Sequence, residues 1–497
     1  MESSKNKNNS QNKRENDGKS YPYINTINKN LLDFDQEKIC SITLKTNNIY
    51  SCLICGKYFH GKGKTTPCYI HSLSEQHHLF INLETRAIYC LPDDYELIEN
   101  QSNKKILYEI KQNLLPVYTK EQIKLIDKIS ANYNLSLDNK KYFPGYIGLG
   151  YVKNCEYFNV IIQSLAHLKK FRDFFLSYNY KIVNKDDYIS IFVQKLSEII
   201  KKLWNFSSYK AHLDQRECLQ LLSKASNNKF ILNFNEKNNN NSNKNDIISF
   251  LSWLLNTLKV FFSSKNFESE NIIEKYFQGI LEIETYILIT DENRNSKLKK
   301  DEKIIKKDGI DYIYSKSKVK FLYLTLDLPM APLFKDSQEK ITIPQINIYE
   351  LFTKFNGIKY SEEPTKGLKR KIKILSLPKY LILIFKRFEN NSFFMEKNPT
   401  IINFQIEGLI VKEKGLSNRS KNTNNEKEKK YNLIANVIHD GKPGDVNYRV
   451  QIKHKERNEW FEIQDIHVQK ILPESVVVGE SYIHFYEQVK DKKEEEK

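Results

Sequence analysis

Two cysteines and two histidines near the N-terminus have the types and spacing that could hold a metal ion. Cys52 and Cys55 are separated by two residues, His71 follows after fifteen more, and His77 after a further five. Two such pairs, brought together by a fold, supply the four ligands that zinc prefers in a tetrahedral site. Because all four would be protein groups, the spacing predicts one closed, structural zinc ion. His78 is an alternative to His77 as the fourth ligand.

A second candidate site contains Cys155, a possible nucleophile. It lies where a polar segment with two glycines, residues 148–154, meets apolar residues that recur at helical spacing from Phe158 to Leu165. The N-terminus of a helix carries partial positive charge and lowers the pKa of a nearby thiol. The pattern therefore predicts a buried helix with a position suited to a nucleophilic cysteine at its start.

Length and composition bound the class of protein. The chain has 497 residues, which favours two domains, and 78 Lys and Arg against 61 Asp and Glu give a net charge of +17. Such a balance favours ribonucleoprotein or acidic protein partners, but no dense arginine patch with interleaved aromatics predicts sequence-specific nucleic-acid binding. No apolar run is long enough for a membrane span, so we expect a soluble, intracellular protein. Seven cysteines indicate reduced thiols and a metal rather than disulfides.

The elements that must position these residues can be read from periodicity. Strands are predicted at 39–44, 321–329 and 377–388, and helices within 101–135, 160–205 and 246–258. Polar, low-complexity composition predicts a disordered basic tail at 1–20, loops at 235–245, 291–309 and 415–430, and a charged tail at 491–497.

The metal-ligand region resembles the ubiquitin-binding-protein (UBP) type of zinc finger. The run Cys-x-x-Cys-Gly-Lys-Tyr-Phe-x-Gly from Cys52, continuing to His71 and to Ile-Asn-Leu-Glu-Thr from Ile81, carries the resemblance. Members that hold the C-terminus of ubiquitin usually have Arg after Cys-Gly, where this chain has Lys57. The resemblance implies that the finger fold is kept, and it leaves open whether ubiquitin or a ubiquitin-like protein binds.

The region around Cys155 resembles the cysteine box of ubiquitin-specific proteases. The anchors, which need no gap, are Gly148, Leu149, Tyr157, Asn159, Gln163 and Leu165. In this register the nucleophile position is Glu156, Cys155 falls on the family's Thr, and Tyr151 falls on the Asn that helps to bind the oxyanion. The resemblance therefore implies that the box is present without its nucleophile.

Later segments resemble the same proteases. Tyr276 to Gly279 matches the start of their fingers subdomain, but the two Cys-x-x-Cys pairs that often follow are missing. In the segment that matches their His box, the general-base position is Asn447, while Asp465 retains the orienting position. His439 matches a non-catalytic His. Because Asn cannot accept and return a proton near neutral pH, this resemblance implies that the base is absent.

The combination resembles one family, the catalytically inactive ubiquitin-specific-protease-like splicing factors of the spliceosomal tri-snRNP. It implies an α+β chain with a UBP-type finger at 21–135 and an inactive, papain-like protease domain (thumb, palm and fingers) at 136–490. The implied function is a nuclear, non-enzymatic scaffold that assembles or retains the tri-snRNP during pre-mRNA splicing. The alternatives are an active deubiquitinating thiol protease that uses Cys155 and an inactive ubiquitin-binding adaptor. The sequence leaves the oligomeric state open.

Overall fold

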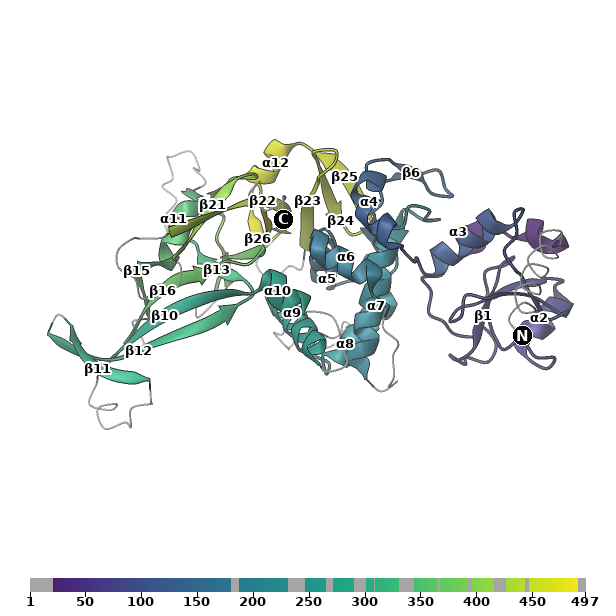
Figure 1. Cartoon of the computed structure of the whole chain (residues 1–497), viewed down its shortest axis with the longest axis horizontal. Coiled ribbons are helices and arrows are strands. Elements are labelled where there is room, and N and C mark those ends of the chain that lie inside the picture. The colour runs from purple at the N-terminus through teal and green to yellow at the C-terminus, as the bar shows by residue number, and fades with distance from the viewer. Residues whose placement is uncertain are drawn as a thin grey trace, which may run out of the picture. The chain divides into compact units, whose positions relative to one another are not determined.

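The computed structural model of the chain (Figure 1) describes most of it in eleven stretches. They are residues 21–179, 187–230, 246–264, 271–289, 301–307, 309–329, 344–363, 367–390, 395–414, 426–442 and 447–489. The predicted tails at 1–20 and 491–497 and the predicted loop at 235–245 lie outside these stretches. No helix among the described residues has the length and apolar character needed to cross a membrane.

Contacts between residues divide the chain into two compact units. The first unit comprises the residues up to 150 together with 175–227, and the second comprises 151–174 and the residues from 228 onward. The first unit thus includes helices that lie beyond the predicted domain boundary near residue 135. The division falls within helix α6 (Lys169–Ser177).

The first unit contains a five-stranded antiparallel sheet in the order β2-β1-β3-β4-β5. Its central strands are short and buried because apolar residues such as Ile49, Leu79 and Ile88 pack into one core. The strands are β1 (Ile49–Cys52), β2 (Tyr58–His60), β3 (Leu79–Asn82), β4 (Ile88–Cys90) and β5 (Tyr95–Glu96). Shorter pieces of this unit are η1 (Pro22–Thr26), η2 (Lys29–Leu31), β6 (Asn134–Leu135) with β7 (Lys141–Tyr142), and β8 (Gly148–Leu149) with β9 (His212–Leu213).

Among the described residues, five helices belong wholly to the first unit. They are α2 (Pro67–Ser74), α3 (Lys104–Leu114), α4 (Lys120–Ser130), α7 (Tyr188–Leu203) and α8 (Arg216–Ala225). The start of α4 is fixed by a capping box, in which Thr119 and Gln122 satisfy each other's free backbone N–H groups. Helices α3 and α4 confirm the prediction of one or two helices within 101–135.

The strand predicted at 39–44 is wrong, because the backbone turns there. The N–H of Leu44 donates to the carbonyl of Cys40 (3.1 Å), and the N–H of Cys40 donates to the carbonyl of Lys45 (2.9 Å). Leu44 has a positive φ of 56°. Ile42 and Leu44 are 63% and 75% exposed, so their alternation with polar residues does not mark a buried face. These backbone groups therefore hydrogen-bond within a local turn, whereas in a strand they would pair with a neighbouring strand.

The second unit contains five further helices among the described residues, of which α5 begins at Glu156. They are α5 (Glu156–Ala166), α9 (Ile247–Ser263), α10 (Ile272–Phe277), α11 (Ile348–Phe352), α12 (Pro473–Val478) and the turn η3 (Thr353–Phe355). Helix α9 confirms the prediction at 246–258, and Asp246 caps it by accepting from the N–H groups of Ile248 and Ser249. Every residue of α5 is buried. The prediction of a buried helix after the Gly-containing segment is thus confirmed.

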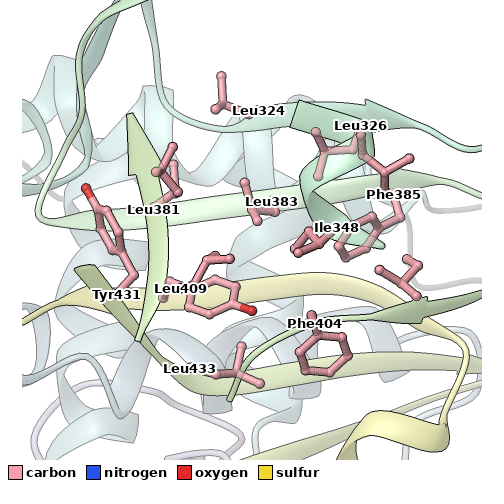
Figure 2. Close-up of a cluster of buried hydrophobic side chains, with 14 of the residues drawn as sticks. Leu324, Leu326, Ile348, Leu381, Leu383, Phe385, Phe404, Leu409, Tyr431 and Leu433 are labelled. Carbon is pink, nitrogen blue, oxygen red and sulfur yellow. The ribbon is translucent and has the colours of Figure 1, made fainter. Parts of the chain in front are cut away.

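The largest sheet of the second unit has the order β13-β17-β26-β22-β23-β24-β25, and β21 also pairs with β22. Only the β13–β17 pair is parallel. The strands are β13 (Leu324–Asp327), β17 (Tyr380–Lys386), β21 (Leu409–Lys414), β22 (Glu426–Asp440), β23 (Asn447–His454), β24 (Glu459–Gln464), β25 (His467–Ile471) and β26 (Ser481–Gln488). Apolar side chains from β13, β17, β21 and β22 converge in one core (Figure 2).

Three predicted boundaries in this sheet need correction, and the first is that of β17, which covers Tyr380–Lys386 and not all of 377–388. The strand predicted at 321–329 is shorter, since β13 covers only Leu324–Asp327 and Phe321 ends the preceding strand. The loop predicted at 415–430 is also too long, because residues 426–430 belong to β22, where they pair with β21. Their Lys and Glu side chains lie on strands whose backbone groups are satisfied by pairing, so polar composition alone did not mark a loop. Residues 415–425 lie outside the described stretches.

A second antiparallel sheet of this unit has the order β11-β12-β10-β16-β15 and is called here the finger sheet (Figure 1). Its strands are β10 (Gly279–Leu288), β11 (Glu302–Lys307), β12 (Ile310–Phe321), β15 (Asn356–Glu363) and β16 (Leu368–Ser376). The loop predicted at 291–309 is therefore wrong where it covers β11. Smaller pairs are β14 (Gln345–Asn347) with β20 (Ile401–Asn403) and β18 (Phe388–Asn390) with β19 (Met395–Lys397).

Candidate functional sites

The four residues proposed as metal ligands come together in the first unit. Their ligand atoms all lie within 4.8 Å of one another. Cys52 Sγ is 3.6 Å from His77 Nδ1, Cys55 Sγ is 3.4 Å from His71 Nε2, and the two imidazole nitrogens are 3.1 Å apart. Ordinary zinc bond lengths in a tetrahedron would place a sulfur and a nitrogen about 3.6 Å apart and two nitrogens about 3.4 Å apart. The arrangement therefore fits a zinc ion.

A tight turn at Gly56 holds the two cysteines in place. Cys52 ends β1, and the N–H of Gly56 donates to the Cys52 carbonyl at 2.9 Å. Gly56 has a φ of 74°, and a Cβ there would lie 2.0 Å from the carbonyl oxygen of Leu31. Only glycine fits this close approach. The imidazole of His71, on α2, stacks on the ring of Phe59 at 4.3 Å, which fixes its orientation.

His78, the alternative fourth ligand, lies outside this group. Its Nδ1 lies 2.8 Å from the carbonyl oxygen of Leu91, and its ring packs against Tyr23. The other cysteines of the finger, Cys40, Cys68 and Cys90, are buried, and within the stretches that the structure describes they form no second metal-ligand group.

Cys155 does not have the environment of a nucleophile. It is the residue that precedes the first turn of α5, it is 1% exposed, and burial raises the pKa of its thiol to about 12, with a further contribution from the charge of Glu156. The expectation that the helix N-terminus lowers this pKa is thus wrong, because loss of water outweighs the helix dipole here. Among the described residues, no imidazole lies within hydrogen-bonding distance of the thiol.

Glu156 instead forms part of a small acidic cluster. Burial, the largest cause, raises the pKa of its carboxyl to about 7, and the nearby Asp465 carboxylate raises it too, whereas hydrogen bonds from backbone N–H groups and from the Tyr151 hydroxyl oppose the shift. Burial also raises the pKa of Asp465, whose Oδ1 accepts a hydrogen bond of 2.8 Å from Asn159 Nδ2. Tyr151 itself is 61% exposed.

The position expected to hold a base is filled by a hydrogen-bonded amide. Asn447 begins β23 at an exposed position, and its Oδ1 accepts from Gln464 Nε2 at 2.9 Å. His439 on β22 is buried, with its ring 4.9 Å from Phe388 and 5.1 Å from Tyr448. The structure therefore places this imidazole in an aromatic cluster, as expected for a residue that supports packing.

Glu156 and Asp465 were each candidate residues in the sequence, but nothing in the sequence predicted their proximity. They are more than 300 positions apart, and only the packing of α5 against β22 and β23 brings them together. The signal that could have found the pair is Asn159, one turn after Glu156, since an amide at that position can donate to a carboxylate.

Together these features define a protease-like domain joined to a metal-binding finger. The family model "Ubiquitin carboxyl-terminal hydrolase" matches residues 147–486, and "Zn-finger in ubiquitin-hydrolases and other protein" matches residues 40–102. The chain belongs to the ubiquitin carboxyl-terminal hydrolase family, in a form that carries a UBP-type zinc finger. The finger model and the Cys/His group both indicate zinc binding.

Individual proteins similar to this chain include splicing factors. "Ubiquitin carboxyl-terminal hydrolase 39" of Mus musculus is 38% identical over 94% of this chain and 79% of its own length. "Pre-mRNA-splicing factor SAD1" of Saccharomyces cerevisiae is 29% identical over 94% of this chain and 93% of its own. A solved structure described as "Crystal structure of an essential yeast splicing factor" matches with a TM-score of 0.69 at 27% identity, over 95% of this chain and all of that one.

The raised pKa of Glu156 predicts a pH-dependent cost to stability. Between the ordinary Glu pKa and about 7, the folded chain keeps a proton that the unfolded chain has lost, so the stability contribution of this group falls as pH rises. We expect Glu156→Gln to stabilise the chain more at pH 7.5 than at pH 5, with the gain increasing by roughly 1–2 kcal/mol. Urea unfolding of both proteins at the two pH values measures it.

Glu474→Gln, at an exposed position of α12, is the control. The change in free energy of unfolding that it causes should be the same at both pH values. A Glu156→Gln effect that is equal at both pH values would contradict the assigned pKa.

Proposed function

We propose that this chain is a non-catalytic scaffold in pre-mRNA splicing rather than a deubiquitinase. The observation that supports the proposal is that the buried carboxyl group of Glu156, which the resemblance places at the nucleophile position, lies near a second carboxyl group, that of Asp465. Cys155, buried beside it, has a thiol that is protonated at neutral pH. A thiol protease needs its nucleophile and base together, and the base position holds Asn447.

The splicing role is supported by the names of the relatives. A splicing factor of S. cerevisiae aligns with nearly the whole chain, and the solved splicing factor has the same fold over its full length. We further propose that the chain works in the nucleus and binds proteins of the tri-snRNP, which it assembles or retains in the spliceosome. The net charge of +17 would speed association with particles that carry RNA.

The finger contributes one structural zinc ion to this scaffold. Cys52, Cys55, His71 and His77 would be its ligands, which leaves no coordination position for water. Such a closed site contributes folding free energy directly and stiffens the surface around it.

The zinc proposal predicts one zinc ion per chain, lost in Cys55→Ser. Zinc binding in fingers supplies on the order of 10 kcal/mol, which is as large as the stability of a typical domain, so the variant should lose the fold of its finger. Elemental analysis and limited proteolysis of the full chain measure both effects. Cys68→Ala and His78→Ala are the matched controls and should keep the metal. A purified chain without stoichiometric zinc would refute the site.

The proposal also predicts that the chain is catalytically silent. The full chain should not cleave a ubiquitin-amide reporter, and Cys155→Ser should behave like the unaltered chain, because the thiol is buried and no imidazole in the described stretches lies within reach of it. A catalytic member of the family serves as the positive control. Cleavage that Cys155→Ser abolishes would show that Cys155, not Glu156, is the working nucleophile.

The splicing proposal predicts that tagged chain recovers tri-snRNP proteins from nuclear extract, and recovers less at higher salt. Depletion should lower splicing of a pre-mRNA in that extract, and adding back either the unaltered chain or Cys155→Ser should restore it equally. Recovery of ubiquitin-processing proteins without tri-snRNP proteins, with normal splicing after depletion, would overturn the proposal.

A further inference from the structure

The finger sheet has two faces with different chemistry. Residues directly opposite each other in an antiparallel pair lie on the same face, so the strand register assigns each side chain to a face. One face, called here the lysine-tyrosine face, carries Lys316, Lys318 and Lys320 from β12, and Lys369, Lys371 and Lys373 from β16. Strand β11 adds Lys303 and Lys307.

The charge of this face is strongly positive. Its acidic residues are Glu282 and Glu284 on β10 and Glu362 on β15. This face therefore carries eight lysines and three glutamates, and its net charge is +5. The opposite face holds two cations, Lys306 and Arg370, and at least as many acids, including Glu302 and Asp311, among the residues whose side chains the structure describes. The excess of charge therefore lies on one side of the sheet.

Several of the lysines are available to a ligand. Lys318 and Lys320 are exposed and Lys373 is half-buried, and none of the three forms an ion pair with a residue that the structure describes. Lys316, by contrast, pairs with both Glu282 (2.9 Å) and Glu284 (3.2 Å). Alternate residues of a strand are about 6.8 Å apart, so β12 presents a regular row of ammonium groups. That spacing resembles the distance between successive phosphates of an extended single strand.

Tyrosines are interleaved with these lysines. The ring of Tyr286, on the central strand β10, lies 5.2 Å from Tyr314, 6.3 Å from Tyr312 and 5.6 Å from Tyr360. Lys307 lies 4.8 Å from the ring centre of Tyr360. Because Lys307 and Tyr360 belong to the two opposite edge strands, the sheet must curl toward this face. Tyr312 and Tyr314 remain partly exposed.

We propose that the lysine-tyrosine face binds single-stranded RNA without reading its sequence. A basic surface that follows the backbone, combined with aromatic rings on which bases stack, is how such strands are bound. An acidic peptide would pair with the lysines, whereas a single strand would pair with the lysines and also stack its bases on Tyr312 and Tyr314, so the combination favours RNA. The preference for RNA over DNA rests on the proposed function; the binding of a phosphodiester strand does not.

The test uses the full chain and a fluorescent oligouridylate, with affinity followed by anisotropy over a range of salt concentrations. We expect Lys318→Gln, Lys320→Gln and Lys373→Gln together to weaken binding about 10- to 100-fold at 0.1 M salt, and to lower the slope of log affinity against log salt by about 2. Tyr312→Leu with Tyr314→Leu keeps apolar area but removes stacking, so it should weaken binding about 10-fold while leaving the slope unchanged.

The matched control neutralises three exposed lysines of α3 and α4, Lys104→Gln, Lys105→Gln and Lys124→Gln, which change the net charge equally. It should leave binding within about twofold. Equal loss in both lysine sets would show diffuse attraction and overturn the proposal, as would absence of binding at low salt. Competition by polyglutamate as effective as by unlabelled RNA would assign the face to acidic protein instead. The cleavage and splicing assays that test the proposed function are separate from this binding assay. Failure of the proposed function is therefore distinguishable from failure of the RNA-binding proposal.

Discussion

The protease-like half of the molecule depends on the complete burial of α5. The helix packs against α9, β22 and β23, the rings of Tyr157 and Phe158 lie 5.2 and 5.6 Å from that of Phe250 on α9, and no side chain of the helix is exposed. Burial of that much apolar surface is the main favourable free energy available to such a domain. It also removes water from whatever residue begins the helix, which here is a carboxylic acid.

The same burial explains why the fold does not depend on which residues stand at the proposed catalytic positions. The residues that form the core are apolar and are set by packing, while Glu156, Asn447 and Tyr151, which we propose stand at the catalytic positions, contribute little to that core. Tyr151, which is exposed, is hydrogen-bonded to Glu156, and Asn447 accepts a hydrogen bond from Gln464. The fold therefore tolerates their replacement, since fold and function are separable properties of a chain.

The finger sheet of the second unit is stabilised mainly by strand pairing, whereas the region around α5 is stabilised by burial. The chain lacks the cysteine pairs that often bind zinc in this subdomain, and the long β10–β12 and β10–β16 ladders take their place. At the base, Leu281 and Ile374 join the core of the large sheet. Further out, the tyrosine cluster around Tyr286 supplies apolar area on the other face. A sheet held by backbone pairing leaves its outward side chains free to carry charge, and this one carries lysine.

Elements with a local signal could be predicted from the sequence. The spacing of Cys52, Cys55, His71 and His77 predicted the Cys/His group that the structure brings together, and apolar periodicity predicted α5, α9 and β17. Tertiary structure decided what depends on distant neighbours. It placed His77 rather than His78 in the metal group, turned the chain at 39–44, and made strands of residues 302–307 and 426–430. It also set Glu156 beside Asp465 and raised the pKa of both carboxyls. Water exclusion and strand pairing are properties of the assembled chain, because each is created by residues far apart in sequence.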